Sequence, residues 1–390
     1  MQTKIGNMAA LALAATLAQS AWAHGRHDED RTALVAARSH FFGEKNVDQR
    51  SGKVDEDKVI ISYFSVQSFA VAAQGRVFLL DSYIYRLADQ PAYVPTTVQE
   101  LVDLKPEAIF LGHGHGDHAD NAAYIAVKTG ATIFGAAEHC DAMRGDAARI
   151  FGAGTPVNCV SLTTAGSTPG SEVQSINFLR PDICITSFKH LHSGAAPLDP
   201  SVPVVPIAPV RDPRVNDLYP PQPAPSLDTR TQAGAGGTVS MFYQFTVGDF
   251  SLIWHDTNGP IRAFQPQLEP LIASLPKADV ELGSLVSIGE TTNGTYDIAL
   301  YIQLVKPKIF YGGHADNFNI GASPYYHRAL RRQLEAFGVP ASEVPDIAGW
   351  DDPYDYLEPG LATFDIKDKR WHEVPAGKRA VACHGHSHHD

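Results

Sequence analysis

Cysteine is scarce in this chain of 390 residues, which holds four: Cys140, Cys159, Cys184 and Cys383. No two of them form a Cys-x-x-Cys pair, so a structural zinc knuckle is not expected. In an oxidising compartment Cys140 and Cys159 could pair across a helix-loop connection, and buried free thiols are the alternative. Cys184 lies inside an apolar, strand-like run, and we expect it in the core rather than as a nucleophile.

Several other features are missing from the sequence. It has no Gly-x-Ser-x-Gly motif and no phosphate-binding loop, which argues against a serine hydrolase built on a nucleophile elbow. It has no internal repeat. Beyond the N-terminus no apolar run is long enough for a membrane helix, so we expect a soluble mature protein without a membrane span.

Basic residues are outnumbered, with 31 Lys and Arg against 43 Asp and Glu and a formal net charge of -12. A strongly acidic protein is a poor electrostatic partner for phosphate backbones or anionic lipid. We therefore expect a small-molecule substrate and no nucleic-acid partner. The sequence gives no indication of the oligomeric state. With 44% hydrophobic residues the chain can bury a sizeable core.

The N-terminus has the pattern of a secretory signal. Lys4 supplies the positive start, an apolar run extends from Met8 to Leu17, and Ala21-Trp22-Ala23 matches a signal-peptidase site. We expect residues 1–23 to be cleaved, which takes the formal charge from -12 to -13, and a periplasmic or secreted mature protein. Residues 24–50 are polar and are interpreted as a loose leader.

Strand-like and helix-like segments alternate along the rest of the chain, which is typical of an α/β architecture. Helices are predicted at 96–104, 121–128, 138–151, 261–275, 296–305 and 323–337. Strands are predicted at 59–64, 68–72, 76–81, 108–111, 131–134, 173–178, 183–188, 241–247, 250–254, 280–288 and 308–311.

The chain is organised around the short apolar strand 108–111 and the turn that follows it. The strand breaks at Gly112, and Gly114 and Gly116 let the backbone turn tightly so that side chains can converge. Imidazole and carboxylate groups are the ligands that Zn²⁺ prefers when it keeps an open position for water. Four such donors leave the strand within six residues: His113, His115, Asp117 and His118.

The arrangement of apolar strand, turn and metal donor recurs three times. Strand 183–188 is followed by His190 and His192, strand 250–254 by His255 and Asp256, and strand 308–311 by His314. Donors at the same end of successive strands can meet at one rim of a sandwich. Taken alone, each of these residues is better explained by a core or surface role. Taken together, the set is better explained by a two-metal site. Asp81 also ends its strand, where a turn cap is as good an explanation as a functional role.

The motif His-x-His-x-Asp-His resembles the signature of the metallo-β-lactamase superfamily. The resemblance implies an αβ/βα sandwich, with two mixed β-sheets packed face to face and helices outside. The superfamily-like domain is expected over residues 51–345, with a Pro-rich insertion at 195–237 that is interpreted as a flap over the site. Residues 346–390 are expected to form a tail that ends in a His-rich segment. Ile288-Gly and the run 306–314 look similar to the ascorbate-6-phosphate lactonase-like branch.

The resemblance also implies a role for each donor. His113, His115 and His192 correspond to the ligands of a first metal, and Asp117, His118 and His314 to those of a second. Asp256 corresponds to the carboxylate that bridges both. His190 then either supports a ligand from behind or faces solvent, and His255 either orients a ligand or substrate or simply ends its strand. Redox di-iron members have a carboxylate where this chain has His115, which favours zinc.

These features predict a secreted or periplasmic hydrolase that holds two divalent metal ions, expected to be Zn²⁺. A metal-bridging hydroxide would attack an ester, lactone or amide bond, and Asp117 would orient the nucleophile or shuttle its proton. One alternative is a phosphodiesterase acting on a small or lipid phosphodiester. The other is a non-catalytic metal-binding protein, which the His-rich ends would suit.

Overall fold

The computed structural model describes residues 28–84, 95–179, 181–196, 201, 203–205, 227–231, 236–285, 293–317, 322–352 and 355–381. The predicted signal peptide, most of the Pro-rich insertion with its predicted flap, and the His-rich C-terminal end lie outside these residues. None of the helices among the described residues combines the length and apolar character that a membrane crossing requires.

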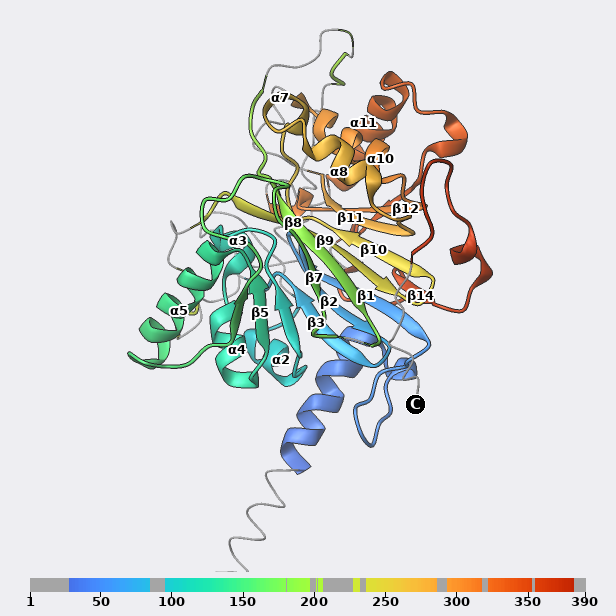
Figure 1. Ribbon diagram of the computed structural model, residues 1–390. Helices are drawn as coiled ribbons and strands as arrows, with labels where there is room; N and C mark the ends of the chain where they lie inside the picture. The colour runs from blue at the N-terminus through green and yellow to red at the C-terminus, as the bar shows by residue number, and fades with distance from the viewer. Residues whose placement is uncertain are drawn as a thin grey trace, which may run out of the picture.

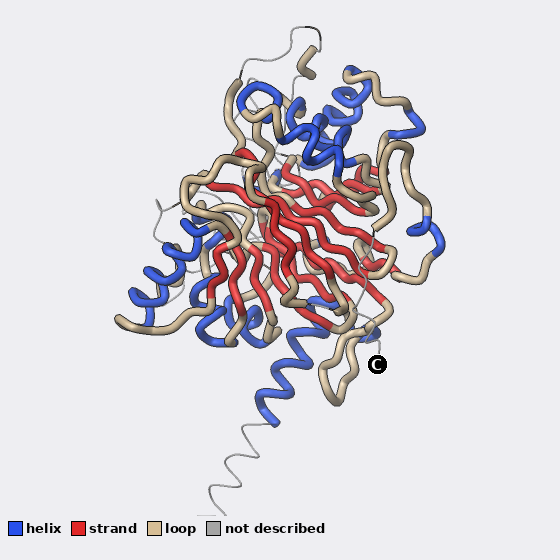
Figure 2. The backbone as a smooth tube through the Cα atoms, viewed as in Figure 1, coloured by secondary structure: helices blue, strands red, loops and turns tan. Residues whose placement is uncertain are grey.

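The described residues form two seven-stranded sheets (Figures 1 and 2). The first has the order β14 (Thr363–Asp365), β1 (Lys58–Ser65), β2 (Ser68–Ala73), β3 (Arg76–Leu80), β4 (Ala108–Phe110), β5 (Thr132–Gly135) and β6 (Cys159–Ser161). The second has the order β13 (Asp346–Gly349), β12 (Ile309–Gly313), β11 (Val280–Ser284), β10 (Phe250–Trp254), β9 (Val239–Val247), β8 (Cys184–Leu191) and β7 (Val173–Ile176).

Both sheets are mixed, as the sequence predicts. In the first sheet β14, β1, β2 and β3 pair antiparallel, and β3 to β6 pair parallel. In the second sheet β7 to β10 pair antiparallel, and β10 to β13 pair parallel. The two halves of the chain therefore repeat one plan, an antiparallel meander followed by parallel strands that are connected through helices.

The helices lie on the outer faces of the two sheets (Figure 1). The first half contains η1 (Glu44–Asn46), α2 (Val98–Asp103), α3 (Gly116–Ala119), α4 (Ala122–Thr129) and α5 (Ala137–Phe151). The second half contains α7 (Ile261–Phe264), α8 (Leu268–Ser274), α10 (Tyr296–Val305), η2 (Ala315–Asn317), α11 (Ser323–Ala336), η3 (Ala341–Glu343) and η5 (Lys369–His372).

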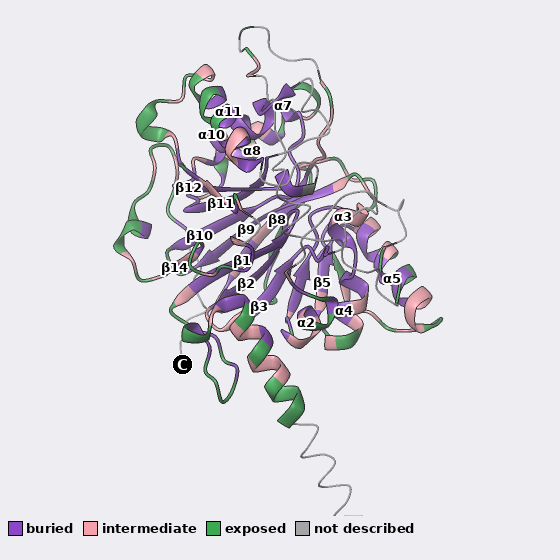
Figure 3. Ribbon diagram, turned by 180° about the vertical axis from the view of Figure 1, so that it is seen from behind, coloured by how far each residue is buried: buried purple, intermediate pink, exposed green. Residues whose placement is uncertain are grey.

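Three apolar layers hold the sheets and helices together. Successive residues of a strand point to opposite faces, so Ile61 of β1 faces the core between the sheets and Ile60 faces the helices of the first half. In the second sheet Trp254 faces the core between the sheets and Ile253 faces the helices of the second half. Buried residues accordingly fill both sheets, and exposed ones gather on the outer helices and loops (Figure 3). This αβ/βα sandwich is the predicted fold.

The expected domain limits are wrong at both ends. Residues 28–42 are helical rather than a loose leader, and Phe41 and Phe42 are fully buried against the first sheet. The domain also continues past residue 345, because β13 and β14 each complete a sheet and Trp371 is fully buried. The described part of the predicted tail is therefore structural.

Most of the predicted strands and helices are observed, but the helix expected at 261–275 is divided into α7 and α8. The break falls at Gln265, whose φ of -142° and ψ of 57° are not helical. Pro266 follows it, and a proline disfavours helical geometry at the preceding residue. The proline therefore ends α7 after a single turn.

The possible pairing of Cys140 with Cys159 is present as a disulfide that joins α5 to the edge strand β6. Cys184 of β8 is also disulfide-bonded. The expectation that Cys184 is not a nucleophile agrees with this state, since a disulfide sulfur is not a free thiolate.

Candidate metal centre

Three histidines from two segments form the first group of donors. His113 and His115 follow β4, and His192 follows β8. The ring centroid of His113 lies 4.9 Å from that of His115 and 4.7 Å from that of His192, and the His115 and His192 centroids are 4.8 Å apart. One nitrogen from each of the three rings lies within 4.8 Å of the other two. The three rings therefore surround a space in which one metal ion could be held.

A second group lies beside the first. The Nε2 atoms of His118 and His314 are 3.0 Å apart. The Oδ2 atom of Asp117 lies 3.8 Å from Nε2 of His118 and 3.7 Å from Nε2 of His314. Two imidazole nitrogens and a carboxylate oxygen thus converge on one point from opposite halves of the chain.

Asp256 lies between the two groups. Its Oδ2 is 2.6 Å from Nδ1 of His113 and 3.2 Å from Nδ1 of His118, one residue from each group. The carboxylate is fully buried, and its Oδ1 has no hydrogen-bond partner among the described residues. A buried charged oxygen of this kind requires a counter-charge or a ligand. The donor set and this orphaned oxygen fit a divalent metal ion.

Glycine is required directly behind the Asp256 carboxylate. A Cβ at Gly112 would stand 2.1 Å from the Asp256 carboxyl group, well inside van der Waals contact. The backbone of Gly112, just after β4, is held by two hydrogen bonds: Met241 N–H donates to Gly112 O (2.6 Å), and Gly112 N–H donates to the Asp81 side chain at Oδ1 (2.9 Å). The backbone at Gly112 and the Asp256 carboxylate therefore lie in close contact, which places the loop that carries His113 to His118 against the C-terminal end of β10.

The remainder of the motif loop is placed by a second glycine and by a short helix. A Cβ at Gly114 would stand 2.9 Å from the carbonyl oxygen of Gly236, so the Pro-rich insertion returns directly over the loop. His115 is the N-cap of α3, and α3 carries Asp117 and His118. One turn of helix thus directs the last two donors of the motif to the second group.

Asp81 has a role beyond that of a turn cap. Its Oδ2 accepts a hydrogen bond from Nδ1 of His118 at 2.8 Å, and both residues are fully buried. When Nδ1 carries the proton, the lone pair of Nε2 faces the second group, and such carboxylate–histidine pairs orient metal ligands. Burial and the nearby Asp256 raise the pKa of Asp81 well above its usual value.

The protonation states suit metal binding. Burial lowers the pKa of His113 well below its usual value, and burial together with His118 lowers that of His314 to about 4. Burial acts to raise the pKa of Asp117, but the surrounding histidines, His118 first, lower it to about 2. These imidazoles are therefore neutral and Asp117 is ionised at neutral pH, the forms that coordinate metals.

His118 differs from the other histidines of the centre. Burial acts to lower its pKa, but the carboxylates of Asp117, Asp256 and Asp81 together raise it well above its usual value. The centre therefore carries an excess of negative charge. This charge favours a bound cation, which can be either a proton on His118 or a metal ion that replaces that proton.

His190 and His255 do not join either donor group. His190 lies on the opposite face of β8 from the centre, where its Nδ1 is 3.1 Å from the Tyr301 hydroxyl. It is buried, so the solvent-facing alternative is wrong. His255 is fully buried, with Nε2 2.8 Å from Glu281 Oε1 and Nδ1 3.1 Å from Thr257 O. It immediately precedes Asp256 and contacts the strand behind the centre.

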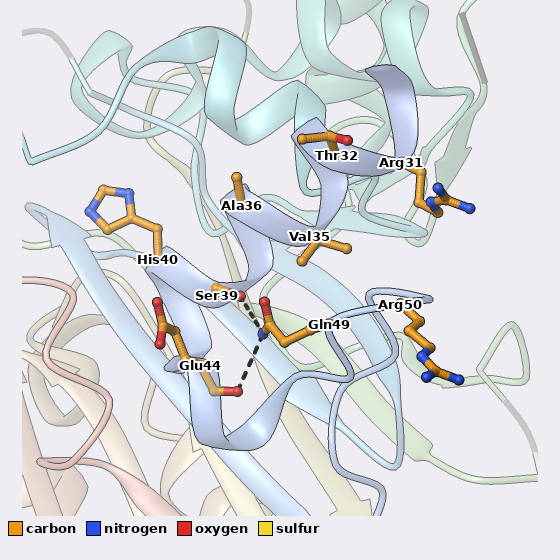
Figure 4. Close-up of a pocket in the computed structure, with 9 residues that line it drawn as sticks. All are labelled: Arg31, Thr32, Val35, Ala36, Ser39, His40, Glu44, Gln49 and Arg50. Atoms are coloured by element: carbon orange, nitrogen blue, oxygen red, sulfur yellow. Dashed lines mark hydrogen bonds between the residues drawn. The ribbon is translucent and has the colours of Figure 1, made fainter. Parts of the chain in front are cut away.

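A groove of about 770 Å³ lies elsewhere, beside the helix at 28–42 (Figure 4). The Nε2 atom of Gln49 donates to Ser39 Oγ and to Glu44 O on its floor. Its lining contains none of the donors described above. The convergence of donors, rather than the size of this groove, is the basis for the candidate functional site.

The fold and the centre define a protein that places two groups of metal donors at one rim of an αβ/βα sandwich. No family model matches the chain. A UPF0173 metal-dependent hydrolase of Pyrobaculum neutrophilum is 33% identical over 78 residues, which is 20% of this chain and 32% of that relative. The match thus spans about a third of the length of the curated relative.

Two solved structures are similar to the chain. Igni18, a metallo hydrolase from Ignicoccus hospitalis, has 15% identity and a TM-score of 0.48, with 80% of this chain and 100% of that chain covered. YhfI from Bacillus subtilis, a metallo-β-lactamase fold protein, has 10% identity and a TM-score of 0.37, with 75% and 95% covered. The fold assignment itself depends on the topology of the two sheets.

That topology and the motif at the end of β4 agree with the predicted resemblance to the metallo-β-lactamase superfamily, and the local match is to a curated metal-dependent hydrolase. None of the proteins named above is described as an ascorbate-6-phosphate lactonase, so that branch stays a prediction. The clusters at the rim are able to bind metal.

Proposed function

We propose that this protein is a secreted or periplasmic hydrolase that uses two divalent metal ions, with Zn²⁺ as the expected metal. The observation that carries the proposal is the buried Asp256 carboxylate, which contacts one residue of each donor group. A carboxylate in this place can serve two ions at once. Imidazole and carboxylate ligands without thiolate suit zinc in a catalytic site.

His113, His115 and His192 would hold one ion, and Asp117, His118 and His314 the other. Such a pair of ions supplies Lewis acidity and makes water a nucleophile at neutral pH. Asp81 keeps His118 in the tautomer that offers Nε2 to the centre. Among the three carboxylates only Asp117 is partly exposed, with 26% of its side chain accessible.

Asp117 is therefore the carboxylate that an incoming substrate and water can reach. Its pKa of about 2 keeps it ionised, so its oxygens accept hydrogen bonds at neutral pH. In this state it can orient the attacking water or take up its proton at a carboxylate oxygen. The reaction needs no covalent intermediate, because no nucleophilic side chain is required when water attacks directly. We propose an ester, lactone or amide as the substrate class.

The proposed location outside the cytoplasm has support from the disulfide between Cys140 and Cys159. Disulfides persist in oxidising compartments and are rare in the cytosol. The signal-like N-terminus points to the same location. Detection of the mature N-terminus near His24 in a periplasmic or culture fraction tests this part of the proposal.

Metal analysis and a substrate screen test the activity. We expect close to two Zn²⁺ per chain and turnover of p-nitrophenyl esters, lactones or amides rather than bis-p-nitrophenyl phosphate. His115→Ala and His192→Ala should each reduce turnover at least about 100-fold, since each removes a ligand. His190→Gln is the matched control on β8 and should keep both metals. Turnover of the phosphodiester alone, or full activity without metal, would contradict the proposal.

A further inference from the structure

The turn between β1 and β2 reaches across the sandwich to the metal centre. It is a two-residue hairpin turn, Val66-Gln67, that belongs to the first sheet. Val66 has a φ of 52°, in the left-handed region. A β-branched residue is rare there, and this position of a tight hairpin usually holds glycine. Such strain persists only where the surroundings fix the backbone.

The backbone of this turn holds the β12 end. The N–H of His314 donates to the carbonyl of Val66 at 2.6 Å, and His314 itself has a φ of 69°. The N–H of Val66 donates in turn to Oδ2 of Asp316 at 3.3 Å. The hydroxyl of Tyr356 donates to the same Asp316 oxygen at 2.9 Å. Two left-handed residues from different sheets are thus bonded directly to each other.

The side chain of Gln67 connects the turn to both ligand-bearing strand ends. It is fully buried. Its Nε2 donates to the carbonyl of His255, the residue before Asp256, at 3.4 Å. Its Oε1 lies over Gly313, the residue before His314, so closely that a Cβ there would stand 2.1 Å away. The amide therefore fills the space between the backbones that carry Asp256 and His314.

We propose that the Val66-Gln67 turn is a positioning element that sets His314, a donor of the second group alone, and supports the backbone beside Asp256, which both groups share. The inference depends on the proposed two-metal centre. The turn bonds the backbone N–H of His314 and the carbonyl of the residue before Asp256. Loss of the Gln67 amide should therefore weaken the site formed by Asp117, His118 and His314 more than the site formed by the three histidines.

The test measures metal binding to the full chain by competition between Zn²⁺ and a chelator, together with the visible spectrum of the Co²⁺-loaded protein. Gln67→Met keeps the length of the side chain and removes its amide. We expect one of the two sites to bind Zn²⁺ about 10- to 100-fold more weakly, as for other residues that orient ligands, and the other site, which shares Asp256, to be weakened less. The Co²⁺ spectrum should change more for that site than for the other.

Gln74→Met is the matched control. Gln74 occupies the next hairpin turn, between β2 and β3 at the opposite end of the sheet, and also has a positive φ, of 49°. It should keep wild-type affinity at both sites. Tyr356→Phe is the second variant, in case Gln67→Met does not fold. It keeps the ring against Tyr63 and removes the hydroxyl that holds Asp316, and it should weaken the same single site.

Wild-type affinity at both sites in Tyr356→Phe and in a folded Gln67→Met would overturn the inference and leave the two-metal proposal standing. Equal weakening at both sites would overturn it as well. A wild-type protein that binds fewer than two Zn²⁺ ions would instead overturn the two-metal proposal, and the inference with it.

Discussion

Replacement of Gly112 by alanine gives a direct test of how the centre is built. The new Cβ would stand 2.1 Å from both Cγ and Oδ2 of Asp256 and 2.6 Å from Oδ1. Ordinary contact begins near 3.4 Å, so the carboxylate must move by about 1 Å. Metal–ligand distances tolerate only about 0.2 Å. The displacement would therefore take Asp256 out of the coordination sphere of at least one of the two proposed ions.

Two magnitudes follow for Gly112→Ala. Overpacking a buried site costs about 1–3 kcal/mol of unfolding free energy. Loss of a shared ligand should reduce the bound metal to about one ion per chain or fewer and reduce turnover accordingly. Urea unfolding of the metal-free protein gives the first quantity, and elemental analysis after dialysis gives the second.

Gly145→Ala is the matched control for this variant. Gly145 lies inside α5 with open space around its hypothetical Cβ. Alanine there should raise the unfolding free energy by about 0.5–1 kcal/mol, because glycine is the poorer helix former. A Gly112→Ala protein with two ions per chain and unchanged stability would refute the assignment of Asp256 as a shared ligand.

Two further predictions concern stability away from the centre. The Cys140–Cys159 disulfide closes a sequence separation of 19 residues, so the double variant with serine should lose about 3 kcal/mol of unfolding free energy in urea; a loss under about 1 kcal/mol would contradict this. Burial, with a smaller contribution from Arg331, lowers the pKa of His327 to about 4. The unfolded state therefore takes up the proton first, and stability present above pH ~6.5 is lost as the pH falls towards 4, by at most about 3 kcal/mol. Metal-free His327→Gln should show a correspondingly flatter pH dependence than the metal-free wild type.

The strands and the donors could be predicted because both depend on local patterns. Apolar runs of four to eight residues bounded by turns identify β1 to β3, β9 and β10, and these are present. Alternation along β8 does not explain why His192 reaches the centre while His190 does not, because residues two apart share a face of a strand. His190 lies within β8 and contacts Tyr301, whereas His192 comes after the last residue of the strand. The convergence of four strand ends on one rim followed from the resemblance to the superfamily, since no local pattern specifies it.

The two ends of the domain could not be predicted in this way. The helix at 28–42 has a polar first half and is attached through Phe41 and Phe42 at its end, so its periodicity is weak. The strand β14 has three residues and exists because β1 offers it an edge. Such short pieces are specified by tertiary contacts rather than by their own propensity.

The residues that support the ligands were the least predictable part of the centre. Val66, Asp81 and His314 all have φ near +50° to +70°, a conformation that is uncommon outside glycine and most unusual for the β-branched Val66. Each is bonded to another segment: Val66 to His314, and Asp81 to Gly112 and His118. A strained backbone costs about 1–3 kcal/mol per residue, so these conformations require contacts that form only when both sheets are packed together. The ligands are consequently set by the assembled sandwich, and metal affinity should fall with any change that loosens the packing of one sheet on the other, even when every ligand is kept.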